Sequence, residues 1–267
     1  MIIDSFLTIS MFIEQVRALG VEPGMTLVVH SSLSSLGFVV GGAPAVILAL
    51  EEVLGEQGTL AMPTHSGDLT DPAGWQNPPV PEDWHVTIRE SMPAFRTDLT
   101  PSEGVGIIPE SFRKQDGTLR SYHPFVSWAA RGPHAETITS DHALSMSSGE
   151  TSPVARLYDL AAKVLFIGSN WDCNTSFHLA EYRNRFAERK RCTRGGPVLT
   201  DTGSTRWVTY DDIYWYDADF MEIGAAFETS GKVRTGLIGK ANCKLFPQRD
   251  AVDFAVKWMN AHRSLGG

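Results

Sequence analysis

The stretch Asn170-Trp-Asp-Cys-Asn-Thr-Ser-Phe-His-Leu-Ala-Glu-Tyr-Arg-Asn-Arg-Phe186 is the part of the sequence on which the rest of the chain is organised. Residues 164–167 before it form a short apolar run closed by Gly168, which is typical of a strand buried on both faces. Apolar residues then repeat at helical spacing, at Leu179, Tyr182 and Phe186. The pattern predicts a strand, a polar turn and a helix, a junction at which α/β folds usually bind ligands.

This junction carries more polar side chains than a plain connection needs. His178 and Glu181 fall on consecutive helical turns and can both transfer protons, and Asp172, Cys173 and Thr175 lie just upstream. A histidine at a helix start is often only a capping or surface residue. The rest of the chain must therefore decide whether the junction is a site.

The composition is that of an ordinary globular protein of 267 residues, with 42% hydrophobic residues. The net charge of −8, without a basic block, argues against nucleic acid or an anionic membrane as a partner and is compatible with a cationic substrate. Cys173, Cys192 and Cys243 have no C-x-x-C spacing, which indicates neither a disulfide framework nor a metal site. No secretory signal or 18-residue apolar stretch is seen, so we expect a cytoplasmic protein.

Residues 26–64 predict a βαβ unit with parallel strands, preceded by a helix over residues 7–19. Between its first strand and its helix lies a serine-rich turn, residues 31–42, which ends in Gly41-Gly42. Backbone amides and hydroxyls at such a helix start can surround a phosphate. The turn has neither a Walker nor a G-x-G-x-x-G pattern, so an ordinary solvated loop remains an equal alternative.

The remaining segments complete the predicted architecture. Residues 65–109, rich in proline and tryptophan, form a loop-rich insert of the kind that covers a site. Arg120 is able to pair with a phosphate, while His123, which precedes Pro124, is either a site residue or a core histidine. Further predicted elements are a helix over 152–160, a strand over 206–210, a helix over 220–228, a hairpin over 233–246 and a helix over 247–262. We predict one α/β domain over residues 1–267, with three layers around a largely parallel or mixed central sheet.

Five motifs, in order along nearly the whole chain, resemble the antibiotic N-acetyltransferase family, which is typified by aminoglycoside 3-N-acetyltransferases. They are His30-Ser-Ser-Leu-Ser-Ser-Leu-Gly37 with Gly41-Gly42, Met62-Pro-Thr64 with Asp71-Pro72, Arg120-Ser-Tyr-His-Pro124, Asn174-Thr-Ser-Phe-His-Leu-Ala-Glu181 and Glu222-Ile-Gly224. The resemblance implies transfer of acetyl from acetyl-coenzyme A to an amine of an aminoglycoside or a related amino compound, without a metal.

The resemblance also implies roles for particular residues. His178 is expected to be the general base, oriented by Glu222, and amides near Thr175 and Ser176 to stabilise the oxyanion. The residues expected to hold coenzyme A are His30, Ser31, Ser32, Ser34, Gly41, Gly42, Arg120, Ser121 and His123. The residues expected to bind the acceptor are Asp68, Asp71, Asp172, Thr175 and Glu181.

Three alternatives stay open from the sequence. In the first, Cys173 is an acetyl-accepting nucleophile in a ping-pong reaction, although it has no positive neighbour to lower its pKa. In the second, the acceptor is an amine other than an aminoglycoside. In the third, the protein binds an amine or coenzyme A without turnover. The sequence leaves the oligomeric state open, a homodimer included.

Overall fold

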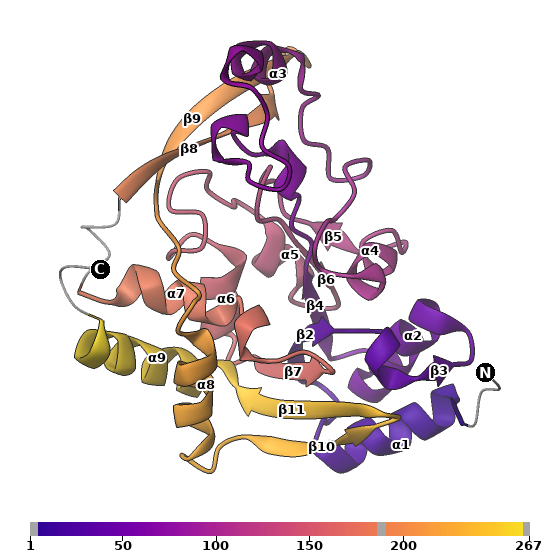
Figure 1. Cartoon of the computed structure of the whole chain (residues 1–267). Coiled ribbons are helices and arrows are strands. Elements are labelled where there is room, and N and C mark those ends of the chain that lie inside the picture. Colours follow the sequence, from indigo (N-terminus) through magenta and orange to yellow (C-terminus); the bar gives the residue numbers. More distant parts are fainter. Residues whose placement is uncertain (1–4, 186–190, 264–267) are drawn as a thin grey trace.

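A mixed seven-stranded sheet forms the centre of the computed structural model, which describes residues 5–185 and 191–263. Its strands follow the order β10-β11-β7-β2-β4-β6-β5 (Figure 1). Their bounds are β2 Thr26–Ser31, β4 Thr59–Pro63, β5 Leu119–Arg120, β6 Trp128–Arg131, β7 Lys163–Ile167, β10 Arg234–Ile238 and β11 Ala241–Pro247. The prediction of an α/β fold around a mixed central sheet is confirmed.

The three middle strands are parallel and the flanking strands are antiparallel. β2 pairs in parallel with β4 and with β7, whereas β11, β10, β6 and β5 add antiparallel ladders outside them. The parallel strands predicted for the βαβ unit are therefore confirmed. In the register of β2 and β7, Ser31 lies opposite Ile167, so the carboxyl ends of these two strands stop side by side.

Helices cover both faces of the sheet because the central strands are apolar on both sides. Leu27 and Val29 of β2 belong to one buried cluster and Val28 belongs to another. The first cluster includes residues of α1 Ile9–Leu19, α2 Gly42–Leu54 and α4 Ile107–Phe112. The second includes residues of α5 Ala135–Thr139, α6 Pro153–Asp159, α7 Ser176–Arg183, α8 Phe220–Glu228 and α9 Gln248–His262. The result is three layers (Figure 1).

The helix boundaries follow the capping residues of the sequence. The Oγ1 of Thr8 accepts a hydrogen bond from the amide of Met11 at the start of α1, and Gly20 ends the helix with φ 108°. Ser152 caps α6 by accepting from the amide of Ala155, with Pro153 in the first turn. Both helices were predicted, with Gly20 as the end of the first and Ser152 and Pro153 as the start of the second, whereas the cap at Thr8 was not.

A long two-stranded ribbon extends beyond the sheet and was only half predicted. It pairs β8 Arg191–Leu199 with β9 Thr205–Ile213, of which only the strand over residues 206–210 was predicted. Strand β8 was not predicted, because glycines such as Gly195 and Gly196 are unusual inside a strand. A Cβ at Gly195 would lie 2.6 Å from the ring of Trp207 on the facing strand, so glycine is required there by the tryptophan that crosses it.

The loop-rich insert packs on the outer part of this ribbon (Figure 1). It contains the helix α3 His85–Ser91 and three short 3-10 turns, Gly67–Leu69, Pro72–Gly74 and Glu82–Trp84. Its apolar residues Leu69, Met92 and Phe95 form a small cluster with Trp207 of β9.

Two short strands, β1 Phe6–Leu7 and β3 Phe38–Val39, pair in parallel beside α2. No helix within residues 5–185 and 191–263 combines the length and the apolar character needed to cross a membrane. Phe186, the last residue of the stretch quoted at the outset, lies outside the described residues.

Candidate functional site

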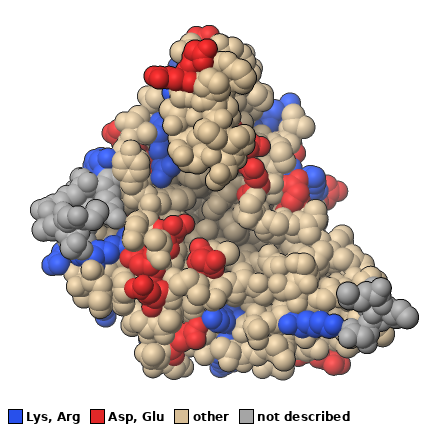
Figure 2. All heavy atoms as spheres, in the orientation of Figure 1, with Lys and Arg blue, Asp and Glu red and all other residues tan. Residues whose placement is uncertain are grey.

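A cleft of about 920 Å³ opens at the carboxyl ends of the three parallel strands. β2 contributes His30 and Ser31, β4 contributes Pro63, and Ser169 follows β7. Figure 2 shows the hollow in the middle of this face, with Asp and Glu side chains gathered along its lower side. The cleft therefore lies where the topology of a parallel sheet places ligand sites.

His178, on the first turns of α7, faces this cleft. Its side chain is 11% exposed, and its Nδ1 lies 2.8 Å from Oε2 of Glu181, three residues further along the helix. The (i, i+3) spacing puts the two groups on one face of α7. The prediction that His178 belongs to a site at this junction agrees with its position, since it lines the cleft next to Thr175 and Asp172.

Glu181 is the carboxylate that holds His178, and this corrects our prediction that Glu222 does so. Glu181 is 1% exposed, and its Oε1 accepts hydrogen bonds from the amide of Tyr216 at 2.9 Å and from Arg263 at 2.8 Å. Glu222 lies in the first turn of α8 with an exposed side chain, away from the cleft-lining residues. Glu181 is therefore not an acceptor-binding carboxylate either, because both of its oxygens are occupied inside the protein.

The segment after β9 was missed by the sequence reasoning, although it completes the cleft. Trp215 and Asp217 line the cleft, as do His65 after β4 and the glycine-rich residues 104–106. The run Tyr214-Trp-Tyr216 was a visible cluster of aromatic residues, but it carries no spacing that relates it to His178. Only the path of the ribbon brings it there.

The serine-rich turn forms one wall of the cleft, which Ser31, Ser32, Ser34 and Gly42 all line; that they hold coenzyme A stays a prediction. The Oγ of Ser31 is buried and makes no hydrogen bond to the described residues. Ser32 and Ser34 share a hydrogen bond of 3.1 Å between their hydroxyls. Gly41 and Gly42 have φ of 86° and 61°, a left-handed conformation that lets the turn enter α2.

His30 lies at the back of the cleft as a neutral imidazole. It is 5% exposed, and burial lowers its pKa to about 4. Its Nε2 lies 3.4 Å from the hydroxyl of Thr175 at the start of α7. The predicted residues His30 and Thr175 are thus brought together, from β2 and α7, beside His178.

Arg120 is not placed to bind a phosphate, which corrects our prediction. Its guanidinium donates to the carbonyls of Thr64 and Thr100 and to the hydroxyl of Ser127, and it lies over the ring of Phe95 at 4.9 Å. Burial lowers the pKa of Arg120 to about 10. All of its nitrogens are used to tie the insert to the edge of the sheet.

The next residues of the same motif are also structural rather than cleft residues. Ser121 is fully buried, and its hydroxyl contacts Nδ1 of His142 at 3.0 Å and accepts from the amide of Trp128. His123 is fully buried, and its Nδ1 accepts from the amides of Phe125 and Val126 at 3.1 Å. The alternative of a core histidine holds for His123, so the prediction that Ser121 and His123 hold coenzyme A is corrected.

Two carboxylates line the cleft, Asp172 and Asp217, and no Lys or Arg among the described residues does. Thr175 also lines the cleft, but the predicted acceptor residues Asp71 and Asp68 lie elsewhere. Asp71 forms an ion pair of 2.7 Å with Arg89 and caps a 3-10 turn. Asp68 is exposed in the insert, where its amide donates to Glu103.

Cys173 lines the cleft next to Asp172, with its thiol in the reduced form. Burial and the negative charge of Asp172 raise the pKa of the Cys173 thiol above its usual value. A raised pKa leaves less thiolate at neutral pH. In the part of the chain that the structure describes, no group of three or more His, Cys, Asp or Glu has the arrangement of a metal site.

A family model, curated relatives and solved structures all match this chain over most of its length. A family model described as aminoglycoside 3-N-acetyltransferase matches residues 28–260. YokD of Bacillus subtilis (strain 168), described as an SPbeta prophage-derived aminoglycoside N(3')-acetyltransferase-like protein, is 46% identical over 246 residues, which cover 92% of this chain and 89% of YokD. The crystal structure of YokD has a TM-score of 0.94 at 44% identity and covers 98% of this chain and 97% of that one.

Two further structures of similar enzymes were solved with bound molecules. AAC-IIIb, in a binary complex with CoASH, has a TM-score of 0.86 at 31% identity and covers 98% of this chain and 100% of that one. AAC-VIa, bound to sisomicin, has a TM-score of 0.87 at 30% identity and covers 97% of this chain and 100% of that one. The match of a family model to most of the chain and the identity to curated relatives agree with each other. The chain therefore belongs to the aminoglycoside 3-N-acetyltransferase family.

Proposed function

We propose that the protein transfers an acetyl group directly from acetyl-coenzyme A to a cationic amine, with His178 as the general base. The observation that carries the proposal is the pairing of His178 with Glu181 at 2.8 Å, in a histidine that faces the cleft. The family gives the reaction class, acyl transfer, and the site supports the roles of the residues.

The hydrogen bond to Glu181 decides which nitrogen of His178 can act. A carboxylate accepts, so Nδ1 carries the proton and donates it to Oε2. The lone pair is then on Nε2, on the other side of the ring. An ammonium has no lone pair, so the reacting nitrogen first gives one proton to Nε2. The neutral amine then attacks the thioester carbon, the C–S bond breaks, and the second N–H proton leaves with coenzyme A, which departs as the thiol.

The serine-rich turn supports binding of acetyl-coenzyme A. Ser31 presents a buried hydroxyl without a partner among the described residues, and the start of α2 at Gly42 directs backbone amides toward the same side. Arg120 donates to the carbonyl of Thr64 and does not reach the cleft. We therefore propose that neutral hydroxyl and amide donors, rather than a cation, bind the phosphates of coenzyme A. The structure of AAC-IIIb with CoASH shows that a relative of the same fold binds coenzyme A.

The tetrahedral oxyanion formed during attack needs hydrogen-bond donors in the cleft. The hydroxyl of Thr175 and the amides at the start of α7 lie next to His178, and we assign them as the donors that stabilise the oxyanion. A well-placed donor of this kind contributes about 3–4 kcal/mol to stabilising the transition state.

The acceptor is proposed to be an aminoglycoside or a similar compound with several ammonium groups. Asp172 and Asp217 line the cleft without an opposing Lys or Arg in the described residues, and carboxylates in a partly dry cleft attract cations more strongly than in water. The relative AAC-VIa was solved with sisomicin, which makes sisomicin the first acceptor to test.

Release of the coenzyme A thiol from acetyl-coenzyme A, with sisomicin as acceptor, tests the proposal. We expect turnover, a Michaelis constant for sisomicin that rises with salt, and a loss of about 10²- to 10⁴-fold in kcat for His178→Gln with unchanged binding of coenzyme A. His134→Gln serves as the matched control and should behave as the unmodified protein, because His134 is half-buried and does not line the cleft. Binding of both compounds without thiol release from any polyamine would favour the non-catalytic alternative.

A further inference from the structure

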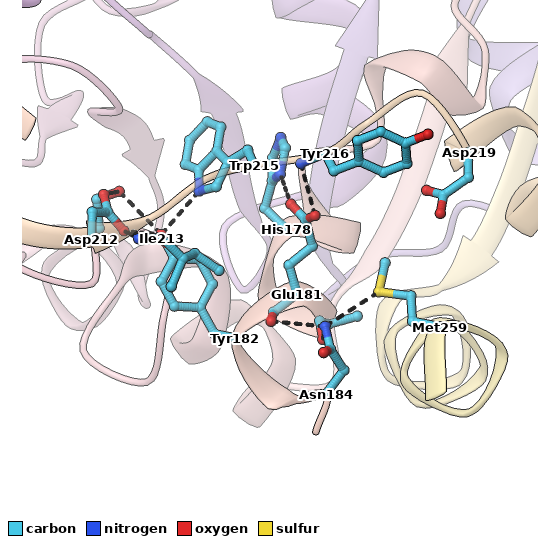
Figure 3. Close-up of polar contacts among 12 residues, drawn as sticks. His178, Glu181, Tyr182, Asn184, Asp212, Ile213, Trp215, Tyr216, Asp219 and Met259 are labelled. Atoms are coloured by element: carbon cyan, nitrogen blue, oxygen red, sulfur yellow. Dashed lines mark hydrogen bonds and ion pairs between the residues drawn. The ribbon is translucent and has the colours of Figure 1, made fainter. Parts of the chain in front are cut away.

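The indole of Trp215 lies flat against the imidazole of His178. The two ring centroids are 3.9 Å apart and the planes are inclined by 24°. The imidazole also contacts the ring of Phe220, at 5.1 Å between centroids. The imidazole therefore contacts two aromatic side chains, one from the segment before α8 and one from its first residue, and Figure 3 shows the indole of Trp215 beside the imidazole.

Trp215 is itself held by contacts that do not involve the cleft. Its Nε1 donates to the hydroxyl of Tyr182 at 2.9 Å, and this hydroxyl donates to Oδ1 of the fully buried Asp212 at 2.5 Å (Figure 3). Phe125 stacks on the indole at 5.4 Å, and the guanidinium of Arg194 lies 5.2 Å from the ring centre. An indole fixed by these groups presents a rigid surface to the histidine.

The neighbouring residue of the same segment contacts the partner of His178. The amide of Tyr216 donates to Oε1 of Glu181 at 2.9 Å. One dipeptide after β9 therefore contacts the imidazole through a side chain and the carboxylate through the backbone. A segment that served only to connect β9 and α8 would have no need to contact both.

We propose that Trp215 is a positioning residue for His178, which fixes the rotation of the imidazole so that Nε2 remains aimed into the cleft. The last torsion of a histidine side chain has broad, roughly two-fold minima, and a single hydrogen bond at Nδ1 does not by itself remove the motion of the ring about that bond. The face contact with Trp215 does. The proposal rests on the proposed role of His178 as the base.

Trp215→Ala, Trp215→Phe and Tyr182→Phe test this positioning. Trp75→Ala is the matched control, because Trp75 is similarly half-buried and donates its indole N–H to Thr70 at 3.0 Å, without contact to His178. The first readout is the pair of side-chain ¹⁵N shifts of His178 at pH 8, assigned by their loss in His178→Gln. The second is kcat with acetyl-coenzyme A and sisomicin, with the Michaelis constant for acetyl-coenzyme A measured alongside.

In the unmodified protein we expect a single tautomer of His178, protonated at Nδ1. Trp215→Ala should give averaged tautomer shifts and a kcat lower by about 10- to 100-fold, since a displacement of 1 Å costs up to about 10²-fold, with an unchanged Michaelis constant for acetyl-coenzyme A. Trp215→Phe should restore most of kcat because a ring again covers the imidazole. Tyr182→Phe, which frees the indole N–H, should lie between the two.

The proposal is overturned if Trp215→Ala keeps the single tautomer and a kcat equal to that of Trp75→Ala. If Trp215→Ala does not fold, Trp215→Phe and Tyr182→Phe carry the test, and unmodified shifts and kcat in Tyr182→Phe then overturn it. Absence of thiol release in the unmodified protein would contradict the proposed function, whereas the tautomer measurement still decides whether Trp215 orients the ring.

Discussion

Replacing Glu181 with glutamine changes one buried oxygen to an amide nitrogen and should disable His178 without removing a side chain. Glu181 accepts three hydrogen bonds, from His178 at 2.8 Å, from the amide of Tyr216 at 2.9 Å and from Arg263 at 2.8 Å. A glutamine has one acceptor and one donor group for these three donors. In either orientation, the NH₂ group of the glutamine therefore faces at least one of the groups that now donate to Glu181.

The two orientations have different consequences for the reaction. If the amide nitrogen faces His178, the imidazole must accept at Nδ1 and carry its proton on Nε2, where it cannot act as a base. If the amide oxygen faces His178, the nitrogen opposes Tyr216 and Arg263, and a buried donor left without an acceptor costs about 1–3 kcal/mol. We expect the first orientation to dominate, because Arg263 and the amide of Tyr216 together need the oxygen.

The expected loss in kcat is about 10²- to 10⁴-fold, the range that a positioned general base contributes. The assay is thiol release from acetyl-coenzyme A at pH 7, with thermal unfolding measured on the same samples. Glu222→Gln is the matched control and should leave kcat unchanged, because its side chain is exposed on α8. Near-normal kcat in Glu181→Gln, with a folded protein, would refute the reasoning about this pair.

Three further outcomes are expected. Cys173→Ala should keep most of the activity, and an acetyl adduct on Cys173 detected by mass spectrometry would contradict direct transfer. Combined Ser31→Ala and Ser32→Ala should raise the Michaelis constant for acetyl-coenzyme A, and an unchanged constant would move coenzyme A away from the serine-rich turn. Burial lowers the pKa of His123 to about 4 and of His142 to about 3 in the folded protein. In the unfolded chain a histidine has a pKa of about 6.5, so below pH 6.5 the unfolded chain binds more protons than the folded protein. The free energy of unfolding by urea should therefore fall as the pH is lowered from about 6.5 toward 4, and equal values at pH 7 and pH 5 would contradict this.

The central part of the fold was predictable because its signals are local. The apolar runs of β2 and β7, the cap Ser152 and the stop at Gly20 each act through neighbours in sequence, and the structure contains all of them. The first strand of the ribbon was missed because it carries two glycines, of which Gly195 faces Trp207 on the other strand. The contact between Gly195 and Trp207 forms only when the two strands pair, so it cannot be read from neighbours in the sequence.

The site shows the same limit. The position of His178 and of the serine-rich turn follows from strand ends, which the sequence locates. The partner of His178 was assigned to Glu222, although Glu181 stood one helical turn away, because the resemblance outweighed the (i, i+3) spacing. Arg120 and His123 were assigned to coenzyme A because nothing in the sequence shows that carbonyls and amides of distant segments already occupy them.

Arg263 gives the site a dependence on the order in which the chain is synthesised. It follows α9, yet it pairs with Glu181 at 2.8 Å and with Asp219 at 2.7 Å. The sheet strands β2, β4 and β7 leave the ribosome about a hundred residues or more before it does. A nascent chain, or a product truncated ahead of Arg263, can therefore assemble its parallel strands while the carboxylate that orients His178 still lacks its counter-charge. Arg263 reaches the proposed catalytic pair only after the strands of the central sheet and α9 have been synthesised, so a chain that stops in the final turns of α9 should lose activity in the thiol-release assay.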